Sequence, residues 1–251
     1  MTTRGKKIYF FSDFHLGVPT YNESLKREKK LIQFFDEIKQ DASEIFLVGD
    51  IFDFWYEYKK AIPKGFVRIQ AKIAECTDAG IPVHYFIGNH DMWTFGYLEQ
   101  ELGVILHKEP IIIERNNKTI YIGHGDGCGP GDYKYKMLKK IFRFKPFQFF
   151  FGLIHPDLGI WIAQKWSYNS RYFQEKEKMQ SKENEWLYVF SRAQKQKNEK
   201  IDYFIFGHRH LVIEYDLEGT NAKYINLGDW IRYFSYALFD GEQLELNYYK
   251  D

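Results

Sequence analysis

The sequence Ile45-Phe46-Leu47-Val48-Gly49-Asp50-Ile51-Phe52-Asp53 places a carboxylate directly after a short apolar run. Residues 45–48 favour a strand, and Gly49 allows a sharp turn beyond them, so we expect Asp50 at the carboxyl end of a buried strand. In open α/β sheets, ligands bind at this edge. A Gly-Asp pair alone is also typical of a turn whose carboxylate caps the next segment, so the interpretation depends on the rest of the chain.

Two further predicted strands end in polar residues, and amphipathic helices at residues 23–39 and 66–79 connect the three strands as in a βαβ unit. The residues after these strands are of types that bind metal ions: Asp13 and His15 after residues 7–11, and Asn89, His90 and Asp91 after residues 83–87. Asp13 and His15 are two apart, so in an extended segment their side chains point the same way. Three strands that end alike indicate a site.

The second half of the chain is rich in predicted strands. A hairpin over residues 111–122 ends in Gly123-His124-Gly125-Asp126, and a strand over residues 203–206 ends in Gly207-His208-Arg209-His210. A first half of α/β type and a later β half predict a four-layer α/β/β/α sandwich of two mixed sheets with helices outside. At 251 residues, we expect one domain over residues 1–251.

Residues 128–200 depart from this pattern and predict a helical insertion that forms a lid. Residues 133–173 interleave lysine and arginine with aromatic residues, and Asp157 is their one acidic residue. Residues 174–200 predict a polar helix that turns Trp186, Leu187, Val189 and Phe190 towards the body. A lid that packs on the body would use such aromatic residues, and so would a lid that contacts lipid.

Composition excludes several classes of protein. The formal net charge of +1 gives no overall field for nucleic acid, and we expect no nucleic-acid partner and no obligate protein partner. Cys76 and Cys128 are too few for a disulfide framework, which fits a reducing compartment. No apolar run reaches the roughly 18 residues that span a bilayer, and no secretory signal is visible.

The polar motifs together supply carboxylates, imidazoles and one amide oxygen. The candidate metal ligands are Asp13, His15, Asp50, Asn89, His124, His208 and His210. Because this set needs no thiolate, it favours Mn²⁺, Mg²⁺, Fe or Zn²⁺ over a structural zinc ion. Two divalent ions that share a carboxylate clamp a phosphoryl group and activate water for in-line attack. The sequence therefore predicts a two-metal centre for phosphoester hydrolysis.

In this order, the motifs resemble those of the calcineurin-like metallophosphoesterase superfamily, over residues 7–126 and 201–230. The resemblance implies one metal held by Asp13, His15, Asp50 and His210. It implies a second metal held by Asp50, Asn89, His124 and His208.

The same resemblance makes His90 a catalytic group that is not a ligand. It would contact the phosphoryl oxygens or protonate the leaving group, with Asp91 orienting its imidazole. Asp53 and Asp126 are open between holding a ligand and capping a turn. His84, His107 and His155 match no motif, and Cys128 has no neighbour that would make it a nucleophile.

Within the superfamily, the insertion and Leu227-Gly228-Asp229-Trp230 are similar to the UDP-2,3-diacylglucosamine pyrophosphatases of lipid A synthesis. This resemblance implies hydrolysis of UDP-2,3-diacylglucosamine, a glycolipid nucleotide, to UMP and 2,3-diacylglucosamine 1-phosphate (lipid X), with Mn²⁺ as the usual metal. It implies a cytoplasmic, peripheral position on the inner face of the inner membrane, with the basic-aromatic lid on the anionic surface. His90 stands where the best-known branch has Arg, so the chain resembles a divergent branch.

We expect the substrate to contact Asn89 and His90, together with Asn169, Ser170 and Arg171 of the lid. Arg209 would face either the substrate or solvent. Two other functions stay open. The same centre could act on another phosphodiester, a nucleotide or a phosphoprotein, although such a substrate needs no aromatic lid. An inactive metal-stabilised scaffold would be expected to have lost ligands or His90.

Overall fold

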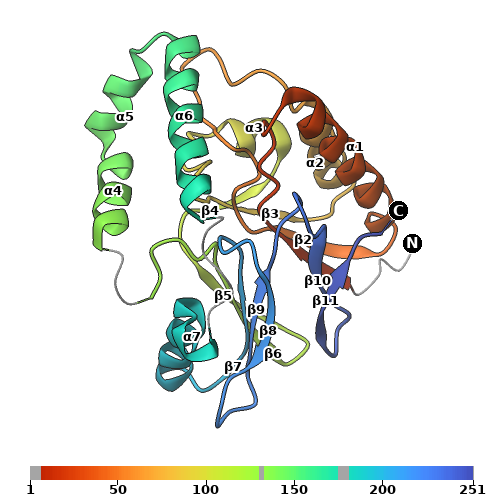
Figure 1. Ribbon diagram of the computed structural model, residues 1–251. Coiled ribbons are helices and arrows are strands. Elements are labelled where there is room, and N and C mark those ends of the chain that lie inside the picture. The colour runs from red at the N-terminus through yellow and green to blue at the C-terminus, as the bar shows by residue number, and fades with distance from the viewer. Residues whose placement is uncertain (1–6, 130–132, 175–180, 251) are drawn as a thin grey trace.

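The computed structural model describes residues 7–129, 133–174 and 181–250, except the side chains of residues 134, 166 and 168–174. Within these residues the strands form two mixed sheets (Figure 1). The first sheet has the order β11-β10-β1-β2-β3-β4 and the second the order β5-β6-β7-β9-β8. The strands of the first sheet are β1 (Lys7–Phe11), β2 (Ala42–Leu47), β3 (Val83–Phe86), β4 (Ile105–His107), β10 (Ser235–Phe239) and β11 (Leu244–Tyr248). Those of the second are β5 (Ile111–Arg115), β6 (Lys118–Ile122), β7 (Ile201–Phe206), β8 (Val212–Asp216) and β9 (Lys223–Leu227).

The two sheets pack face to face because each strand turns alternate side chains to opposite faces. In β1, Ile8 and Phe10 belong to the core between the sheets, where they meet Ile205 and Ile225 of the second sheet. Tyr9 and Phe11 belong to the core on the opposite face. The buried β1 therefore contributes to two cores at once.

Helices cover the outer faces of both sheets. α1 (Tyr21–Ile38), α2 (Val67–Asp78) and α3 (Tyr97–Leu102) pack on the first sheet, and α7 (Trp186–Lys197) packs on the second through Leu187 and Tyr188. α1 begins at an N-cap in which the Thr20 hydroxyl accepts from the amide N–H of Glu23 and donates to the Glu23 carboxylate. The layers run helix, sheet, sheet, helix, which confirms the predicted sandwich.

Of the helices between β6 and β7 in the sequence, α4 (Tyr133–Arg143), α5 (Lys145–Gly152) and α6 (Pro156–Gln174) stand apart from the outer layers (Figure 1). Two aromatic side chains of the body hold α4 and α5, because Trp93 Nε1 donates to the Phe142 carbonyl oxygen (2.9 Å) and the Tyr56 hydroxyl donates to that of Gln148 (2.6 Å). No helix among the described residues is long and apolar enough to cross a membrane.

One element departs from the prediction in its extent. Residues 174–200 were expected to form one helix, but α6 ends at Gln174, a short 3₁₀ turn spans Lys182–Asn184, and α7 starts only at Trp186. The Glu185 side chain sets this start, because it accepts from the amide N–H of Leu187. Trp186, Leu187 and Phe190 do pack on the second sheet, as predicted, whereas Val189 is not part of this core and Tyr188 is.

Candidate metal centre

The predicted ligands all follow parallel strands whose carboxyl ends meet. In the first sheet β1, β2 and β3 are parallel, and in the second β6, β7 and β9 are parallel. The site residues lie in the loops that follow these strands, and the loops approach one another closely. A side chain at Gly207 would run into the Asp13 carboxylate, and one at Gly88 would run into that of Asp50. The loops can meet here because these positions lack a Cβ.

The backbone around the centre is strained. Five of the predicted ligands have a positive φ, a conformation that is uncommon outside glycine: Asp13 (56°), His15 (42°), Asp50 (55°), His208 (68°) and His210 (51°). The expectation that residues 13–15 are extended is therefore wrong, although their side chains do converge. Such strain gathers at functional sites, where the surrounding structure enforces it.

Asp13, His15 and His210 form one group of possible metal ligands. Asp13 Oδ1 is 3.6 Å from His15 Nε2 and 3.4 Å from His210 Nε2, and the two Nε2 atoms are 3.1 Å apart. Among the described residues, Asp13 Oδ1 is buried without a hydrogen-bond partner. A buried carboxylate oxygen that faces two imidazole nitrogens is suited to a shared cation.

Asp50, His124 and His208 form a second group. His124 Nε2 is 3.2 Å from Asp50 Oδ2 and 3.3 Å from Asn89 Oδ1. Asp50 Oδ2 also lies 3.6 Å from His15 Nε2, so this oxygen stands between the two groups. It occupies the position that a carboxylate shared by two ions would take.

A layer of acceptors behind the imidazoles fixes their orientation. His15 Nδ1 lies 3.2 Å from Asp53 Oδ1, His124 Nδ1 lies 2.8 Å from the Val48 carbonyl oxygen, and His210 Nδ1 lies 3.3 Å from Asp229 Oδ2. With the proton on Nδ1, each Nε2 is left to bind a cation. Asp53 thus orients the His15 imidazole. Asp229 was not predicted as a site residue, although its position in Gly228-Asp229 directly after β9 repeats the pattern of Gly49-Asp50.

The electrostatics of the centre favour positive charge. Burial alone would lower the pKa of His124, but the Asp50 carboxylate outweighs burial and raises this pKa to about 10. Burial and the neighbouring His124 lower the pKa of His208 to about 3. The chain therefore has a buried donor set and a field that fit divalent metal ions. Bound there, the ions would polarise a phosphoryl group and activate water.

His90 and Asp91 lie beside this donor set. The His90 amide N–H donates to Asp50 Oδ1 (2.9 Å), and its Nδ1 lies 2.9 Å from the Asp53 carbonyl oxygen. The structure does not bring Asp91 to that imidazole. The Asp91 carboxylate instead accepts from the amide N–H groups of Ile51 and Gly88 and from the Tyr85 hydroxyl. Its contacts therefore join the loops after β2 and β3. Asp91 has this role in place of the predicted one, which was to orient the His90 imidazole.

Asp126 and Arg209 have partners outside the ligand set. Asp126 Oδ2 accepts from the Tyr135 hydroxyl (2.7 Å) and pairs with Lys139 (2.6 Å), so it ties α4 to the body and does not hold His124. The Arg209 guanidinium pairs with Glu185 (3.3 Å), and both side chains are buried. Asn169, Ser170 and Arg171 fall on α6, but their side chains lie outside those described.

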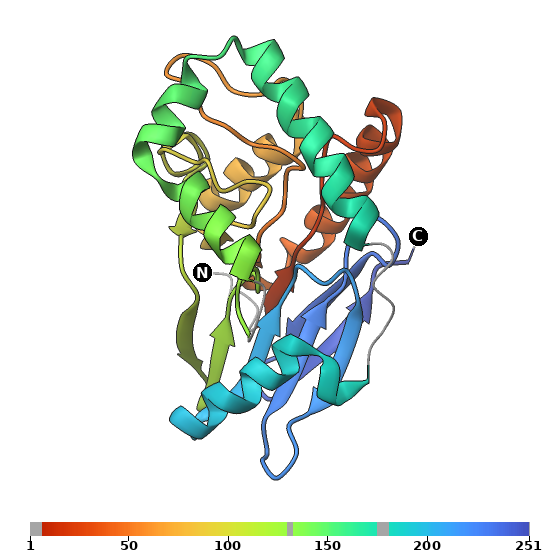
Figure 2. The ribbon, with the colours of Figure 1, turned by 60° about the vertical axis from the view of Figure 1, so that its left-hand side comes forward.

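An apolar chamber of about 330 Å³ adjoins the metal centre. Its walls come from α4, α5 and α6 and from the loops after β2 and β3, which lie between these helices in Figure 2. Asn89, His90 and Ser167 line it together with aromatic side chains, among them Trp93 and Phe151.

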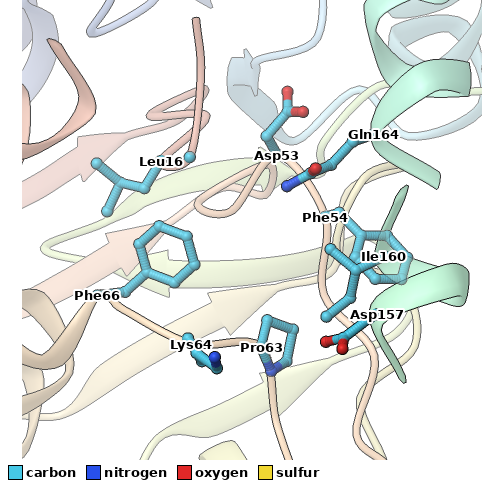
Figure 3. A pocket seen from close by; sticks show the side chains of 10 residues that line it. Leu16, Asp53, Phe54, Pro63, Lys64, Phe66, Asp157, Ile160 and Gln164 are labelled. Atoms are coloured by element: carbon cyan, nitrogen blue, oxygen red, sulfur yellow. The ribbon is translucent and has the colours of Figure 1, made fainter. Parts of the chain in front are cut away.

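A second cavity, of about 260 Å³, shares Asp53 and Phe54 with the chamber. In Figure 3, Leu16 and Phe66 stand opposite Phe54 and Ile160. Ile160 and Gln164 belong to α6, which therefore lines both cavities.

The remaining histidines and Cys128 belong to none of the ligand groups among the described residues. His84 Nδ1 contacts His107 Nε2 (2.9 Å), and His155 is exposed. Burial raises the pKa of Cys128 to about 11, so it stays a thiol at neutral pH.

Comparison with known proteins agrees with this centre. The calcineurin-like phosphoesterase family matches residues 6–212. A UDP-2,3-diacylglucosamine hydrolase of Porphyromonas gingivalis (strain W83) is 36% identical over 98% of this chain and 98% of its own length. Proteins of the same name from Haemophilus influenzae (strain PittGG) and Vibrio cholerae are each 25% identical, over 98% and 96% of this chain and 100% and 98% of their own lengths. The chain therefore belongs to the calcineurin-like phosphoesterase family.

Proposed function

We propose that this chain hydrolyses the diphosphate of UDP-2,3-diacylglucosamine to UMP and 2,3-diacylglucosamine 1-phosphate (lipid X), as a step of lipid A synthesis. The observation that carries the proposal is the apolar chamber whose lining includes Asn89 and His90 beside the metal centre. A relative with 36% identity, matched over 98% of both chains, is named for hydrolysis of this substrate.

The chamber separates this substrate from those without acyl chains. Its volume of about 330 Å³ lies in the range of roughly 300–1,000 Å³ usual for small-molecule sites. Phe142, Phe147, Phe151 and Ile154 supply apolar walls, whereas the polar residues lie towards the metal centre. An acyl chain that fills it is stabilised by about 0.8 kcal/mol for each buried methylene. A free nucleotide or a phosphoprotein would leave this apolar surface unfilled.

We assign the site residues as the resemblance implies. One metal lies among Asp13, His15, Asp50 and His210, and the other among Asp50, Asn89, His124 and His208, with Mn²⁺ as the favoured ion. Asn89 and His90 face the phosphoryl group, and Asn169, Ser170 and Arg171 contact the diphosphate or sugar. Arg209 acts through Glu185, since that buried ion pair joins the start of α7 to the loop of His208 and His210. Asp91 supports the loops that carry Asp50 and His90.

We further propose that residues 128–200 are a lid on a single domain and meet an anionic membrane surface. The outer side of α4 and α5 has an open apolar trough lined by Met137, Ile141, Phe144 and Phe150, all exposed, with Lys140 at its border. Lys140 and Lys145 are exposed, whereas Lys139 pairs with Asp126 and Arg143 with Glu109. Exposed apolar and basic groups side by side favour the inner face of the cytoplasmic membrane.

The test is release of UMP from UDP-2,3-diacylglucosamine in detergent micelles with Mn²⁺, read by mass spectrometry. EDTA should abolish release. Phe142→Ala should raise KM for the lipid substrate and leave hydrolysis of a small phosphodiester unchanged, because it widens only the chamber. Tyr21→Ala, an exposed aromatic residue on α1, is the matched control. Metal-dependent hydrolysis of a small diester without any UMP release would refute the proposed substrate but would still support the proposed metal centre.

A further inference from the structure

The helix α6 contributes one buried hydroxyl to the neighbourhood of the metal centre. Ser167 is 6% exposed, and its Oγ donates to Asp53 Oδ2 (2.8 Å). The same Oγ lies 3.1 Å from His90 Nδ1. Ser167 therefore contacts both the carboxylate that holds His15 and the imidazole beside the phosphoryl site.

These contacts determine which nitrogen of His90 carries a proton. Ser167 uses its hydroxyl proton on Asp53, so towards His90 the oxygen acts as an acceptor. The Asp53 carbonyl oxygen, 2.9 Å from Nδ1, is an acceptor as well. Two acceptors at Nδ1 require an N–H there. Nε2 is then the ring nitrogen left for reacting groups.

The Asp53 carboxylate does not itself accept a hydrogen bond from His90 Nδ1. Its Oδ1 lies 3.2 Å from His15 Nδ1 but 3.8 Å from His90 Nδ1, and the longer distance exceeds a hydrogen bond. Oδ2 is taken by Ser167. The hydroxyl thus bridges a gap that the carboxylate does not span, and it belongs to α6, an element that also forms the chamber wall.

We propose that Ser167 is a positioning residue that holds His90 with Nδ1–H directed away from the reacting groups, so that α6 completes the catalytic site. The proposal rests on the proposed function, in which His90 faces the phosphoryl group. It adds that a single side chain, that of Ser167, both lines the chamber and orients the His90 imidazole. A substrate that packs against α6 and fixes its position therefore also fixes the position of the His90 imidazole.

The kinetic test is Ser167→Ala. Alanine favours a helix, so the variant should fold, with a Tm lowered by a few degrees because a hydrogen bond to the buried Asp53 carboxylate is lost. With the lipid substrate, kcat should fall by about tenfold to a hundredfold, a part of the roughly 10²–10⁴ that a positioned acid–base group supplies, while KM stays within about twofold. Ser167→Thr keeps the hydroxyl and should restore most of kcat. Gln164→Ala, three residues earlier on α6 and lining the other cavity, is the matched control with unchanged kcat.

A second readout does not depend on the substrate. Long-range ¹H–¹⁵N spectra of Zn²⁺-loaded protein, with His90 assigned by His90→Gln, should report an Nδ1–H tautomer. In Ser167→Ala the Asp53 carbonyl oxygen still accepts from Nδ1–H, so the tautomer should persist while the Nδ1 resonance shifts with the loss of the second acceptor. An Nε2–H tautomer in the unaltered protein, or a wild-type kcat for Ser167→Ala, would overturn the proposal. If no UMP is released by any variant, the proposed function fails, whereas the tautomer and the rate on a small diester still decide the role of Ser167.

Discussion

Replacing Asp229 by Asn should weaken metal binding while leaving the local fold intact. Asp229 is fully buried, and its Oδ1 accepts from the amide N–H groups of Ile231 (2.9 Å) and Arg232 (2.6 Å). Its Oδ2 is the acceptor next to His210 Nδ1 and also accepts from Arg232 Nε, each at 3.3 Å. The amide of Asn keeps an oxygen for the two backbone groups. It presents an NH₂ group to His210, and two donors then face each other.

The magnitude follows from the environment of the carboxylate. Hydrogen bonding to His210 and to the backbone outweighs burial and lowers the pKa of Asp229 from 3.8 to about 2. At roughly 1.4 kcal/mol per pKa unit, the folded state favours the carboxylate by about 2.5 kcal/mol. Losing the partner of a metal-binding histidine typically costs about 10- to 100-fold in metal affinity, or roughly 1.4–2.7 kcal/mol. The first figure shows that the folded state strongly favours a charged Asp229, and the second sets the loss of metal affinity that we expect for Asp229→Asn.

Calorimetric titration of chelator-stripped protein with Mn²⁺ measures this loss directly. Asp240→Asn is a matched control, because the Asp240 carboxylate accepts in the same way from the amide N–H groups of Glu242 and Gln243 at the β10–β11 turn. The control should keep the Kd of the unaltered chain. If Asp229→Asn binds Mn²⁺ within about twofold of that Kd, then Asp229 does not orient a metal ligand and the assignment of His210 is in doubt.

Three further predictions concern other parts of the molecule. Asp50→Asn should abolish turnover, because Asp50 Oδ2 stands between the two ligand groups; circular dichroism should show a folded chain, and near-normal turnover would refute the two-metal mechanism. Lys140→Glu with Lys145→Glu should weaken binding to vesicles with anionic lipid several-fold, whereas Lys26→Glu with Lys29→Glu on α1 should not; unchanged binding would remove the membrane role from this surface. Burial and His84 lower the pKa of His107 from 6.5 to about 4. Between pH 4 and 6.5, His107 is therefore protonated in the unfolded chain but neutral in the folded chain. The free energy of unfolding should therefore fall as pH decreases from about 6.5 to 4. Urea titrations over this pH range should show a smaller fall for His107→Asn than for the unaltered chain.

The strands and the donor set could be predicted because both are local in the sequence. Asp50 and Asn89 directly follow apolar runs, and parallel strands bring their carboxyl ends together whatever the details of the loops. The left-handed backbone at Asp13 and His15 could not be predicted, since it is imposed by loops that meet in space. A two-residue spacing carries no information about that conformation.

The partners of the polar side chains were the least predictable feature. Asp91 is next to His90 in the sequence but bonds to the loop of Ile51, whereas Ser167 is 77 residues from His90 and contacts its ring. Such choices depend on where α6 crosses the site, and no pattern within α6 encodes that crossing. The start of α7 at Trp186 likewise depends on the single cap of Glu185.

The tethers from Trp93 and Tyr56 to α4 and α5 end on backbone carbonyl oxygens. A carbonyl group is present whichever residue occupies positions 142 and 148, so mutation there does not remove the acceptor. The side chains of the chamber wall can therefore be exchanged by natural drift or by engineering while the helices keep their attachment. The shape of the chamber can thus change one residue at a time, without a new scaffold.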